Sequence, residues 1–293
     1  MSNNELTENK EKVKQIIYIP TLHQSMFFFR FSLFICLIVY CLLSTANCFS
    51  QPFQCDGKLF FFRDVDGAAG GPDYLSYVDD YTTTPVVGNV CVLPAGGKNC
   101  LGANPKNGYL YFIDESTQDL KRLDAACNIT IQCSNLLGLL TSARGCFDNL
   151  GRFWVITSNN DLRGYDINTC SLVKGPFAIS IIPGADLVFN MSDCHFYMAD
   201  QNQVVKIDSN GVTVATYTPG FNGGTAYGGI VIGVDGNLYG FTNGAATSNL
   251  YMFDLTTNTP QGSVFNFSPG TADPCGCDAA SFPCDSIASY FVI

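Results

Sequence analysis

The sequence predicts an all-β fold, and three observations support this prediction. The 293 residues are 47% hydrophobic and 13% aromatic, with only 14% charged residues. Glycine occurs 28 times and proline 13 times, which indicates many turns between short strands. The third observation is an internal repeat of about 43 residues. Together these features exclude a disordered, collagenous or coiled-coil protein.

Two sequence patterns recur with this period. The first is a Gly-x-apolar-aromatic strand, which returns at steps of 51, 43, 43 and 42 residues from Gly57, with Cys194 in place of glycine once. The second is a strand ending in apolar-x-x-apolar-Asp, and its five members are Asp79, Asp124, Asp166, Asp208 and Asp254. A period of 40 to 50 residues with several short strands is typical of a β-propeller blade. The sequence therefore predicts five four-stranded blades, with a degenerate sixth as the alternative.

Each strand of a blade has its own composition. The strand before the glycine column is rich in small residues, which suits the crowded axis of a propeller; these strands start near Cys100, Ala143, Ala185 and Gly229. The second strand carries one aromatic column, which is predicted to pack between blades: Phe60, Tyr111, Trp154, Tyr197 and Tyr239. The aspartate column ends the third strand, where a carboxylate can accept hydrogen bonds from amides two residues on and open a turn. The outer strands follow as VGNVCVL, ITIQC, SLVKGPF, VTVATY and GSVFNF.

The two ends of the repeat must meet, because an open ring would expose sheet edges. Two segments compete for the innermost strand of the first blade: PFQC before Gly57, and CGCDAASF from Cys275. A disulfide from Cys48 or Cys55 to one of Cys275, Cys277 and Cys284 is predicted to tie the ends together.

The amino-terminal segment predicts export. Residues 1–25 form a polar leader that is cytoplasmic or, if Met26 is the true start, not translated. Residues 26–46 contain the apolar run FSLFICLIVYCLL and small residues up to Ala46, which favours a cleaved signal peptide over an uncleaved signal anchor. Residues 47–285 form the propeller, and residues 286–293 form an apolar carboxy-terminal strand or tail. We expect a secreted or cell-surface protein, with a signal-anchored membrane protein as the alternative.

Cysteine usage agrees with an oxidising compartment. Twelve cysteines lie outside the apolar run and are disulfide candidates: Cys48, Cys55, Cys91, Cys100, Cys127, Cys133, Cys146, Cys170, Cys194, Cys275, Cys277 and Cys284. Their connectivity cannot be read from the sequence. The alternative for the last three is a zinc site, which the lack of a CxxC pair disfavours. Asn128, Asn190 and Asn266 begin Asn-x-Ser/Thr sequons and are candidate glycosylation sites.

The sequence offers few groups for catalysis. After the apolar run it contains one glutamate, Glu115, and one histidine, His195, and a solvent-facing strand position suits His195 better than a general base. The best polar cluster is the glycine-rich insertion RDVDGAAGGPD, where Asp64, Asp66 and Asp73 are calcium-ligand candidates. A solvated loop without metal is the alternative. No other cofactor is expected. The net charge of -10 disfavours nucleic acid as a partner.

The opening Cys55-Asp56-Gly57-Lys58-Leu59-Phe60, with its G-x-L-Y and L-x-x-x-D repeats, resembles an uncharacterised family of secreted β-propeller repeat proteins found in extracellular and adhesin-like proteins. Its blade pattern is also similar to the NHL-repeat and SMP30-type propellers. The resemblance covers about residues 52–282. It implies an extracellular propeller and transfers no catalytic residue to this chain.

These observations favour an extracellular, disulfide-stapled binding or structural module without enzymatic activity. Adhesion, matrix or surface-appendage assembly would fit, with other extracellular proteins or glycans as partners, or a second copy of the chain joined through its terminal strands. Two alternatives remain open. One is a calcium-dependent hydrolase of the lactonase or glycosidase type, and the other is a propeller lectin.

Overall fold

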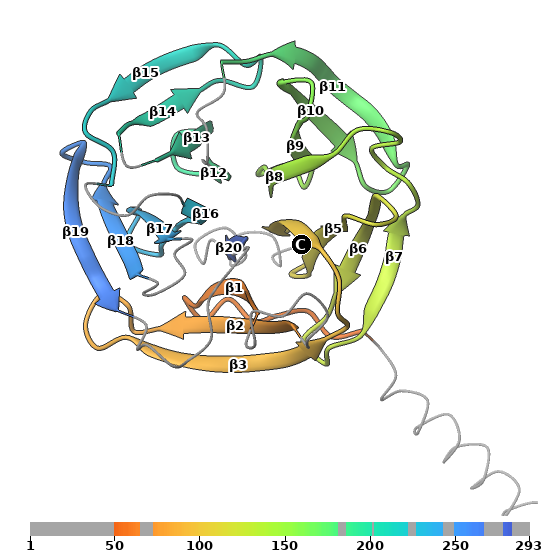
Figure 1. Ribbon diagram of the computed structural model, residues 1–293, viewed down its shortest axis with the longest axis horizontal. Coiled ribbons are helices and arrows are strands. Elements are labelled where there is room, and N and C mark those ends of the chain that lie inside the picture. The colour runs from red at the N-terminus through yellow and green to blue at the C-terminus, as the bar shows by residue number, and fades with distance from the viewer. Residues whose placement is uncertain are drawn as a thin grey trace, which may run out of the picture. The chain divides into compact units, whose positions relative to one another are not determined.

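The computed structural model describes residues 50–64, 73–180, 186–200, 202–221, 227–242, 249–266 and 278–282. These residues belong to one compact unit, Ser50–Ile293. They form five antiparallel four-stranded sheets that radiate from a common axis, as the ribbon view shows (Figure 1). The predicted five-bladed propeller is therefore confirmed.

The chain builds the blades in order, and in each blade the strands run from the axis outward. The first blade contains β20 (Ala279–Ser281), β1 (Leu59–Asp64), β2 (Asp73–Asp79) and β3 (Val86–Leu93). The second contains β4 (Lys98–Ala103), β5 (Leu110–Asp114), β6 (Asp119–Leu123) and β7 (Ile129–Cys133), and the third β8 (Ser142–Phe147), β9 (Phe153–Thr157), β10 (Asp161–Asp166) and β11 (Ser171–Ala178). The fourth contains β12 (Asp186–Asn190), β13 (His195–Ala199), β14 (Val204–Ile207) and β15 (Thr213–Tyr217), and the fifth β16 (Tyr227–Ile232), β17 (Leu238–Thr242), β18 (Asn249–Asp254) and β19 (Thr259–Asn266).

Of the two segments that could supply the innermost strand of the first blade, the carboxy-terminal one closes the ring. Strand β20 pairs with β1, with Ser281 opposite Leu59 and Ala279 opposite Phe61. The competing PFQC segment instead runs past the second blade, where the Phe53 amide donates to the Gly108 carbonyl at 2.7 Å. The ring of Phe53 also packs against that of Phe282, which follows β20, so both ends of the propeller sequence contribute to closure.

The predicted aromatic column lies in the core. All five of its members are at most 4% exposed. Members of the column also form aromatic pairs across the interface between neighbouring blades, and the ring centroids are 5.0 Å apart both for Tyr111 and Phe147 and for Trp154 and Phe196. These contacts confirm that the column forms the packing layers between blades.

The glycine column has a backbone cause. Four of its members adopt a positive φ two residues before the second strand of the blade begins: 81° at Gly57, 72° at Gly108, 77° at Gly151 and 79° at Gly236. Glycine populates this left-handed region without the steric cost that a Cβ adds. In the fourth blade Cys194 occupies the same position with a φ of 58°.

The aspartate column forms turns, as predicted. The Oδ1 atoms of Asp166, Asp208 and Asp254 accept hydrogen bonds from amides two residues further on, at 2.8, 2.9 and 2.7 Å. Asp124 does the same with the Ala126 amide at 3.0 Å. Asp79 differs, because its Oδ1 accepts from the next amide, that of Asp80.

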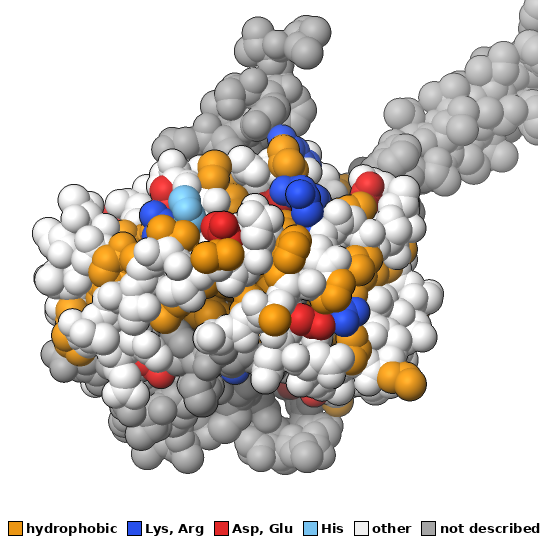
Figure 2. Space-filling view, turned by 90° about the horizontal axis from the view of Figure 1, so that it is seen from above, with side chains coloured by type: hydrophobic (Ala, Val, Ile, Leu, Met, Phe, Trp, Pro, Cys, Tyr) orange, Lys and Arg blue, Asp and Glu red, His pale blue; other side chains and the backbone are white. Residues whose placement is uncertain are grey.

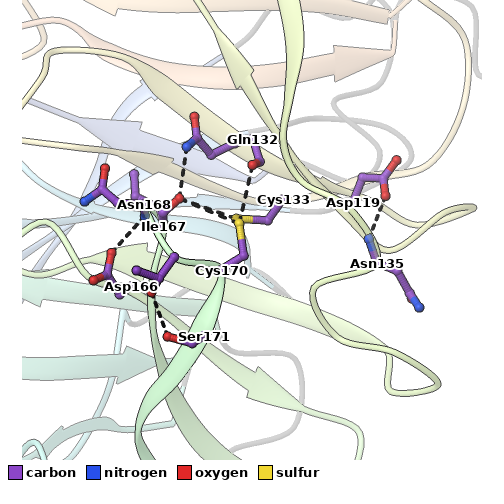
Figure 3. Close-up of a disulfide and its surroundings, with 10 residues drawn as sticks. Asp119, Gln132, Cys133, Asn135, Asp166, Ile167, Asn168, Cys170 and Ser171 are labelled. Carbon is purple, nitrogen blue, oxygen red and sulfur yellow. Dashed lines mark hydrogen bonds between the residues drawn. A yellow bond between two sulfur atoms is a disulfide. The ribbon is translucent and has the colours of Figure 1, made fainter.

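Two disulfides join neighbouring blades at equivalent places. Cys91 on β3 is bonded to Cys127, which lies in the turn before β7, and Cys133 on β7 is bonded to Cys170, in the turn before β11. The second bond is drawn in Figure 3, where the side-chain amide of Gln132 also donates to the Ile167 carbonyl at 2.9 Å. Each bond links an outer strand to the next blade, and the sequence separations of 36 and 37 reflect the repeat.

Three of the disulfide candidates are not disulfide-bonded, which corrects the sequence prediction for these residues. Cys100 and Cys146 lie on the adjacent innermost strands β4 and β8, but their side chains face different apolar layers, one with Tyr111 and the other with Trp154. Cys194 is exposed in its turn. Cys55 is disulfide-bonded, and its partner lies outside the described residues.

Several predictions fall on residues that the structure does not describe. They concern the polar leader 1–25, the signal segment 26–46, the tail 286–293, Asp66, Cys48, Cys275, Cys277 and Cys284. Within the described ranges, no helix has the length and hydropathy that crossing a membrane requires.

Candidate functional site

A cavity of about 380 Å³ follows the axis of the propeller. Its lining comes from the innermost strands of all five blades, as residues 101–103, 146–147, 187–192, 232–234 and 279–281, together with Gly236. The lining residues from β4, β8 and β16 lie at or after the carboxy-terminal part of each strand, whereas β12 and β20 contribute nearly their whole length. The cavity is within the size range of small-molecule sites in proteins.

The lining is mainly apolar, with a few polar groups. Phe189 and Leu187 supply apolar surface, while Asn190, Ser192 and Ser281 supply hydrogen-bonding groups. Ser281 is already bonded, because its hydroxyl donates to the Ile232 carbonyl at 2.6 Å. Such a surface suits a ligand that is chiefly hydrophobic and is oriented by one or two hydrogen bonds.

Turns at the same end of the ring as the cavity lining carry exposed apolar side chains. Val234 lines the cavity and is 54% exposed, and Leu150 in the equivalent turn of the third blade is 61% exposed. Single exposed hydrophobics are also common elsewhere on the molecule, as the edge-on view shows (Figure 2), and Val214 on β15 is 52% exposed. Val234 differs from these because it borders a cavity.

Two buried carboxylates lie where the innermost strands begin. Asp186 starts β12 and Asp278 directly precedes β20, and each is only 1% exposed. Strand register places both at one level of the ring, because Asp278 lies three positions before the residue that pairs with Leu59, and Asp186 lies three positions before the residue that pairs with Phe196, the equivalent of Leu59 in the fourth blade. The same count gives Cys100, Arg144 and Gly229 in the other blades.

Each carboxylate ties its own blade to a neighbour. Asp186 Oδ2 accepts from the Ile230 amide of the fifth blade at 3.1 Å, and Oδ1 accepts from the Leu187 amide at 2.7 Å. Asp278 Oδ2 accepts from the Leu101 amide of the second blade at 3.1 Å. The innermost strands have one edge without a neighbouring strand, so these carboxylates replace missing sheet partners.

The surroundings of Asp186 and Asp278 disfavour the ionisation of both carboxylates. Burial raises the pKa of Asp186 despite the opposing charge of Arg144, and burial together with the charge of Asp186 raises the pKa of Asp278. Burial also lowers the pKa of Arg144, and Asp186 opposes that shift. The Oδ1 atom of Asp278 is buried and has no hydrogen-bond partner. One acceptor at the axis is therefore unused.

His195 belongs to a separate polar group on the fourth blade. Its Nδ1 lies 2.6 Å from the Asp193 carbonyl oxygen, and Lys206 and Tyr197 both bind the Asp193 carboxylate. Burial and that carboxylate raise the pKa of Tyr197. The arrangement neutralises the turn around Asp193, and it offers no nucleophile aligned with the imidazole of His195.

Two of the three calcium-ligand candidates, Asp64 and Asp73, lie within the described residues. Asp64 ends β1 and Asp73 begins β2, and the two residues lie opposite each other in the register of this pair. The carboxylate of Asp73 binds Lys98, so it is already paired with a cation. Among the described residues, no group of three or more His, Cys, Asp or Glu side chains could hold a metal ion. Calcium binding by this insertion stays a prediction.

The sequon asparagines differ in accessibility. Asn190 is only 6% exposed, and its side-chain oxygen accepts from the Ser192 amide at 3.0 Å, so a glycan there would require local rearrangement. The side-chain amide of Asn128 donates to Asp124 at 3.0 Å. Asn266 is exposed at the end of β19.

Sequence reasoning missed the buried acid pair. The available signal was an aspartate at the head of a strand otherwise built of small and apolar residues, as in Asp186-Leu-Val-Phe and Asp278-Ala-Ala-Ser. It was weak because the repeat carries many turn-forming aspartates. Strand pairing was needed to bring residues 186 and 278 to the same level.

Several solved structures are similar to this chain at low sequence identity. One is the nidogen/laminin complex, with 12% identity, a TM-score of 0.49, and coverage of 76% of this chain and 97% of that one. TolB from Acinetobacter baumannii shares 11% identity with a TM-score of 0.48, covering 79% and 68%. A streptogramin B lyase shares 13% identity with a TM-score of 0.41, covering 75% and 76%. No curated protein matches the sequence.

A family model matches residues 77–284, which is more than half of the chain. The matched segment runs from the middle of β2 to beyond β20, so it includes all or part of every blade. The chain belongs to the family described as "Repeat of unknown function (DUF6923)".

Proposed function

We propose that this protein is an extracellular, non-enzymatic binding module that takes a small hydrophobic group of its partner into the axial cavity. The cavity carries the proposal, since five strands converge on it and its lining is mainly apolar with a few hydrogen-bonding groups. The group would be an aromatic or aliphatic portion of another extracellular protein or of a glycan conjugate. Adhesion or matrix assembly would use such a contact.

The extracellular assignment draws support from the disulfides. Two bonds link outer strands of neighbouring blades, and such bonds persist in oxidising compartments. The signal segment predicted for residues 26–46 agrees with it. Expression in a secreting host followed by amino-terminal sequencing tests the assignment, and a mature chain beginning at Asn47 would support cleavage after Ala46. Retention of the intact chain inside the cell would contradict secretion.

The cavity can be tested with small uncharged aromatic probes. Saturation-transfer NMR with indole should give a signal for the native protein. Val234→Trp places a bulky side chain at a cavity-lining position that is already half exposed, and it should abolish the signal without harming the fold. Val214→Trp, at a similarly exposed position on β15, is the matched control and should retain it. Equal binding by both variants, or none by the native protein, would rule out the cavity as the site.

A calcium-dependent hydrolase is the second candidate, and one observation favours it. The buried carboxylates of Asp186 and Asp278 directly precede cavity-lining residues, so acidic groups border the inner end of the cavity. Turnover of lactone, ester or glycoside substrates in the presence of calcium, lost in Asp186→Asn, would support this candidate. Turnover that Asp186→Asn leaves unchanged would remove these residues from any catalytic role.

A further inference from the structure

The innermost strands of the propeller have one edge without a strand partner. In each blade the innermost strand pairs on one side only, and its other edge faces the axis. Amides on this edge are partly satisfied by carboxylates, as shown by the bonds of Ile230 to Asp186 and of Leu101 to Asp278. Carbonyl oxygens alternate with these amides along the same edge. They are hard, neutral ligands of the kind that calcium accepts.

At the level of the ring where Asp186 and Asp278 lie, the side chains carry more negative than positive charge. Asp186 and Asp278 contribute two carboxylates, and Arg144 is the basic residue at the same level of the ring. Glu115 adds a further negative charge that acts on Asp278. Burying carboxylates with incomplete compensation is costly, so such groups are usually neutralised by a proton, a partner or a metal ion.

One atom at this level is without a partner. Asp278 is 1% exposed, yet its Oδ1 makes no hydrogen bond. Buried polar atoms in native proteins nearly always have a partner, and an exception indicates an ion, a water or a proton. The geometry of this ring level therefore indicates a ligand for the free oxygen of Asp278.

We propose that Asp278 and Asp186 bind one calcium ion at the axis, with main-chain carbonyl oxygens of the innermost strands completing its coordination. Calcium accepts six to eight oxygen ligands in flexible geometry, whereas magnesium needs a near-ideal octahedron that a ring of five strands does not provide. The described residues hold no cluster of three acidic or other metal-binding side chains, so main-chain oxygens must supply most ligands. This site is distinct from the Asp64, Asp66 and Asp73 insertion and does not depend on what fills the cavity.

The proposal is tested by calorimetry on the purified chain after chelator treatment and dialysis. Titration with calcium chloride should show one site, and saturating calcium should raise the thermal midpoint by roughly 5 °C or more, because binding to the folded state alone stabilises it. Magnesium at equal concentration should have a much smaller effect. Asp278→Asn keeps the shape and the acceptor for the Leu101 amide but removes the charge, and it should abolish the shift.

Two control variants locate the site. Asp200→Asn alters another buried aspartate, which is 8% exposed and accepts from the Asn202 amide at 2.7 Å on the fourth blade, and it should keep the calcium response. Asp66→Asn tests the insertion and should also keep it. If Asp278→Asn does not fold, Asp186→Asn replaces it, with the same expected loss.

Three results would overturn the proposal. The first is a native chain with no calcium response, in which case a shared proton neutralises the pair. The second is a response that survives Asp278→Asn or Asp186→Asn. The third is a response that Asp66→Asn abolishes while Asp278→Asn retains it, which would place calcium in the insertion.

Discussion

The carboxylate of Asp278 accepts a hydrogen bond from the main-chain nitrogen of Leu101 at 3.1 Å, across 177 positions of sequence. Strand β20 already pairs with β1, so this second bond attaches the closing strand to the next blade as well. Closure of the ring therefore involves two neighbouring blades rather than one. The buried carboxylate acts here as a substitute for a strand partner.

This relationship predicts a difference between two substitutions at residue 278. Asp278→Asn retains an oxygen that can accept from the Leu101 amide, whereas Asp278→Ala leaves that buried amide without an acceptor. We expect the alanine variant to have a free energy of unfolding about 2 kcal/mol lower than the asparagine variant. Urea unfolding in chelator measures the difference. Equal stability would show that water replaces the carboxylate at no cost.

The inter-blade disulfides predict a specific loss of stability. Replacing both Cys133 and Cys170 by alanine should lower the free energy of unfolding by about 2 to 4 kcal/mol, because the bond restricts a loop of 37 residues in the unfolded chain. The pair Cys91 and Cys127 closes a loop of 36 residues and should give a similar loss. Denaturant unfolding of both double variants tests this, with Cys194→Ser as a control that removes a free thiol. A loss confined to one pair would show that native-state packing, rather than loop restriction, determines the effect.

Cys194 is a position where a substitution should stabilise the protein. It holds a φ of 58° at the place where four other blades have glycine. Glycine removes the cost of a Cβ in this conformation, and its greater freedom in the unfolded chain offsets part of the gain. We expect Cys194→Gly to raise the free energy of unfolding by about 0.5 kcal/mol. Cys194→Ala should not raise the free energy of unfolding. Equal effects of the two substitutions would mean that loss of the thiol, and not the backbone conformation, is responsible.

Most of the architecture could be predicted from the sequence because the repeat is local. Gly108 sets a turn and Tyr111, three residues later, sets a core position in the strand that follows, and the same spacing recurs at Gly151 and Trp154. Turn chemistry at Asp208 was equally local. Such features depend on neighbours in the chain, so one blade predicts the next.

The site could not be predicted in the same way. Asp186 and Asp278 reach the same level of the axis only when the ring is assembled, and their hydrogen bonds join strands from four blades. Disulfide pairing also depended on the assembled ring, since Cys91 and Cys127 approach only because one outer strand lies beside the turn of the next blade. Cys100 and Cys146 are not disulfide-bonded to each other because their side chains face different apolar layers, which a cysteine count does not reveal.

Asp114 predicts an acid-dependent contribution to stability. Although burial alone would raise its pKa, hydrogen bonds from Lys121 and Ser116 lower the pKa of Asp114 to about 2. A lowered pKa in the folded state means that the contribution is complete above about pH 4 and is lost as the pH falls toward 2. We expect Asp114→Asn to cost up to about 1 kcal/mol at pH 7, because solvent partly screens the pair. Urea unfolding at pH 7, 4, 3 and 2 should show the two proteins converging at the lowest pH; a constant gap would assign the effect to packing.

Cys55 predicts how the ends of the ring are fastened covalently. Its sulfur is disulfide-bonded and lies 3.5 Å from the carbonyl oxygen of Phe282, at the end of the described chain. Cys284 follows two residues later, whereas Cys275 and Cys277 precede β20, whose three extended residues span about 10 Å. We therefore expect a bond between Cys55 and Cys284.

Mass spectrometry of the non-reduced protein after proteolysis identifies the partner directly. A peptide pair joining residues 55 and 284 should appear and should disappear on reduction. Cys284→Ser should lower stability by about as much as Cys55→Ser, and the double variant should add nothing further, because both remove the same bond. A pair joining Cys55 to Cys277 would instead place the covalent link before the closing strand, and β20 would then be held at its end by main-chain pairing and by packing of Phe282 on Phe60.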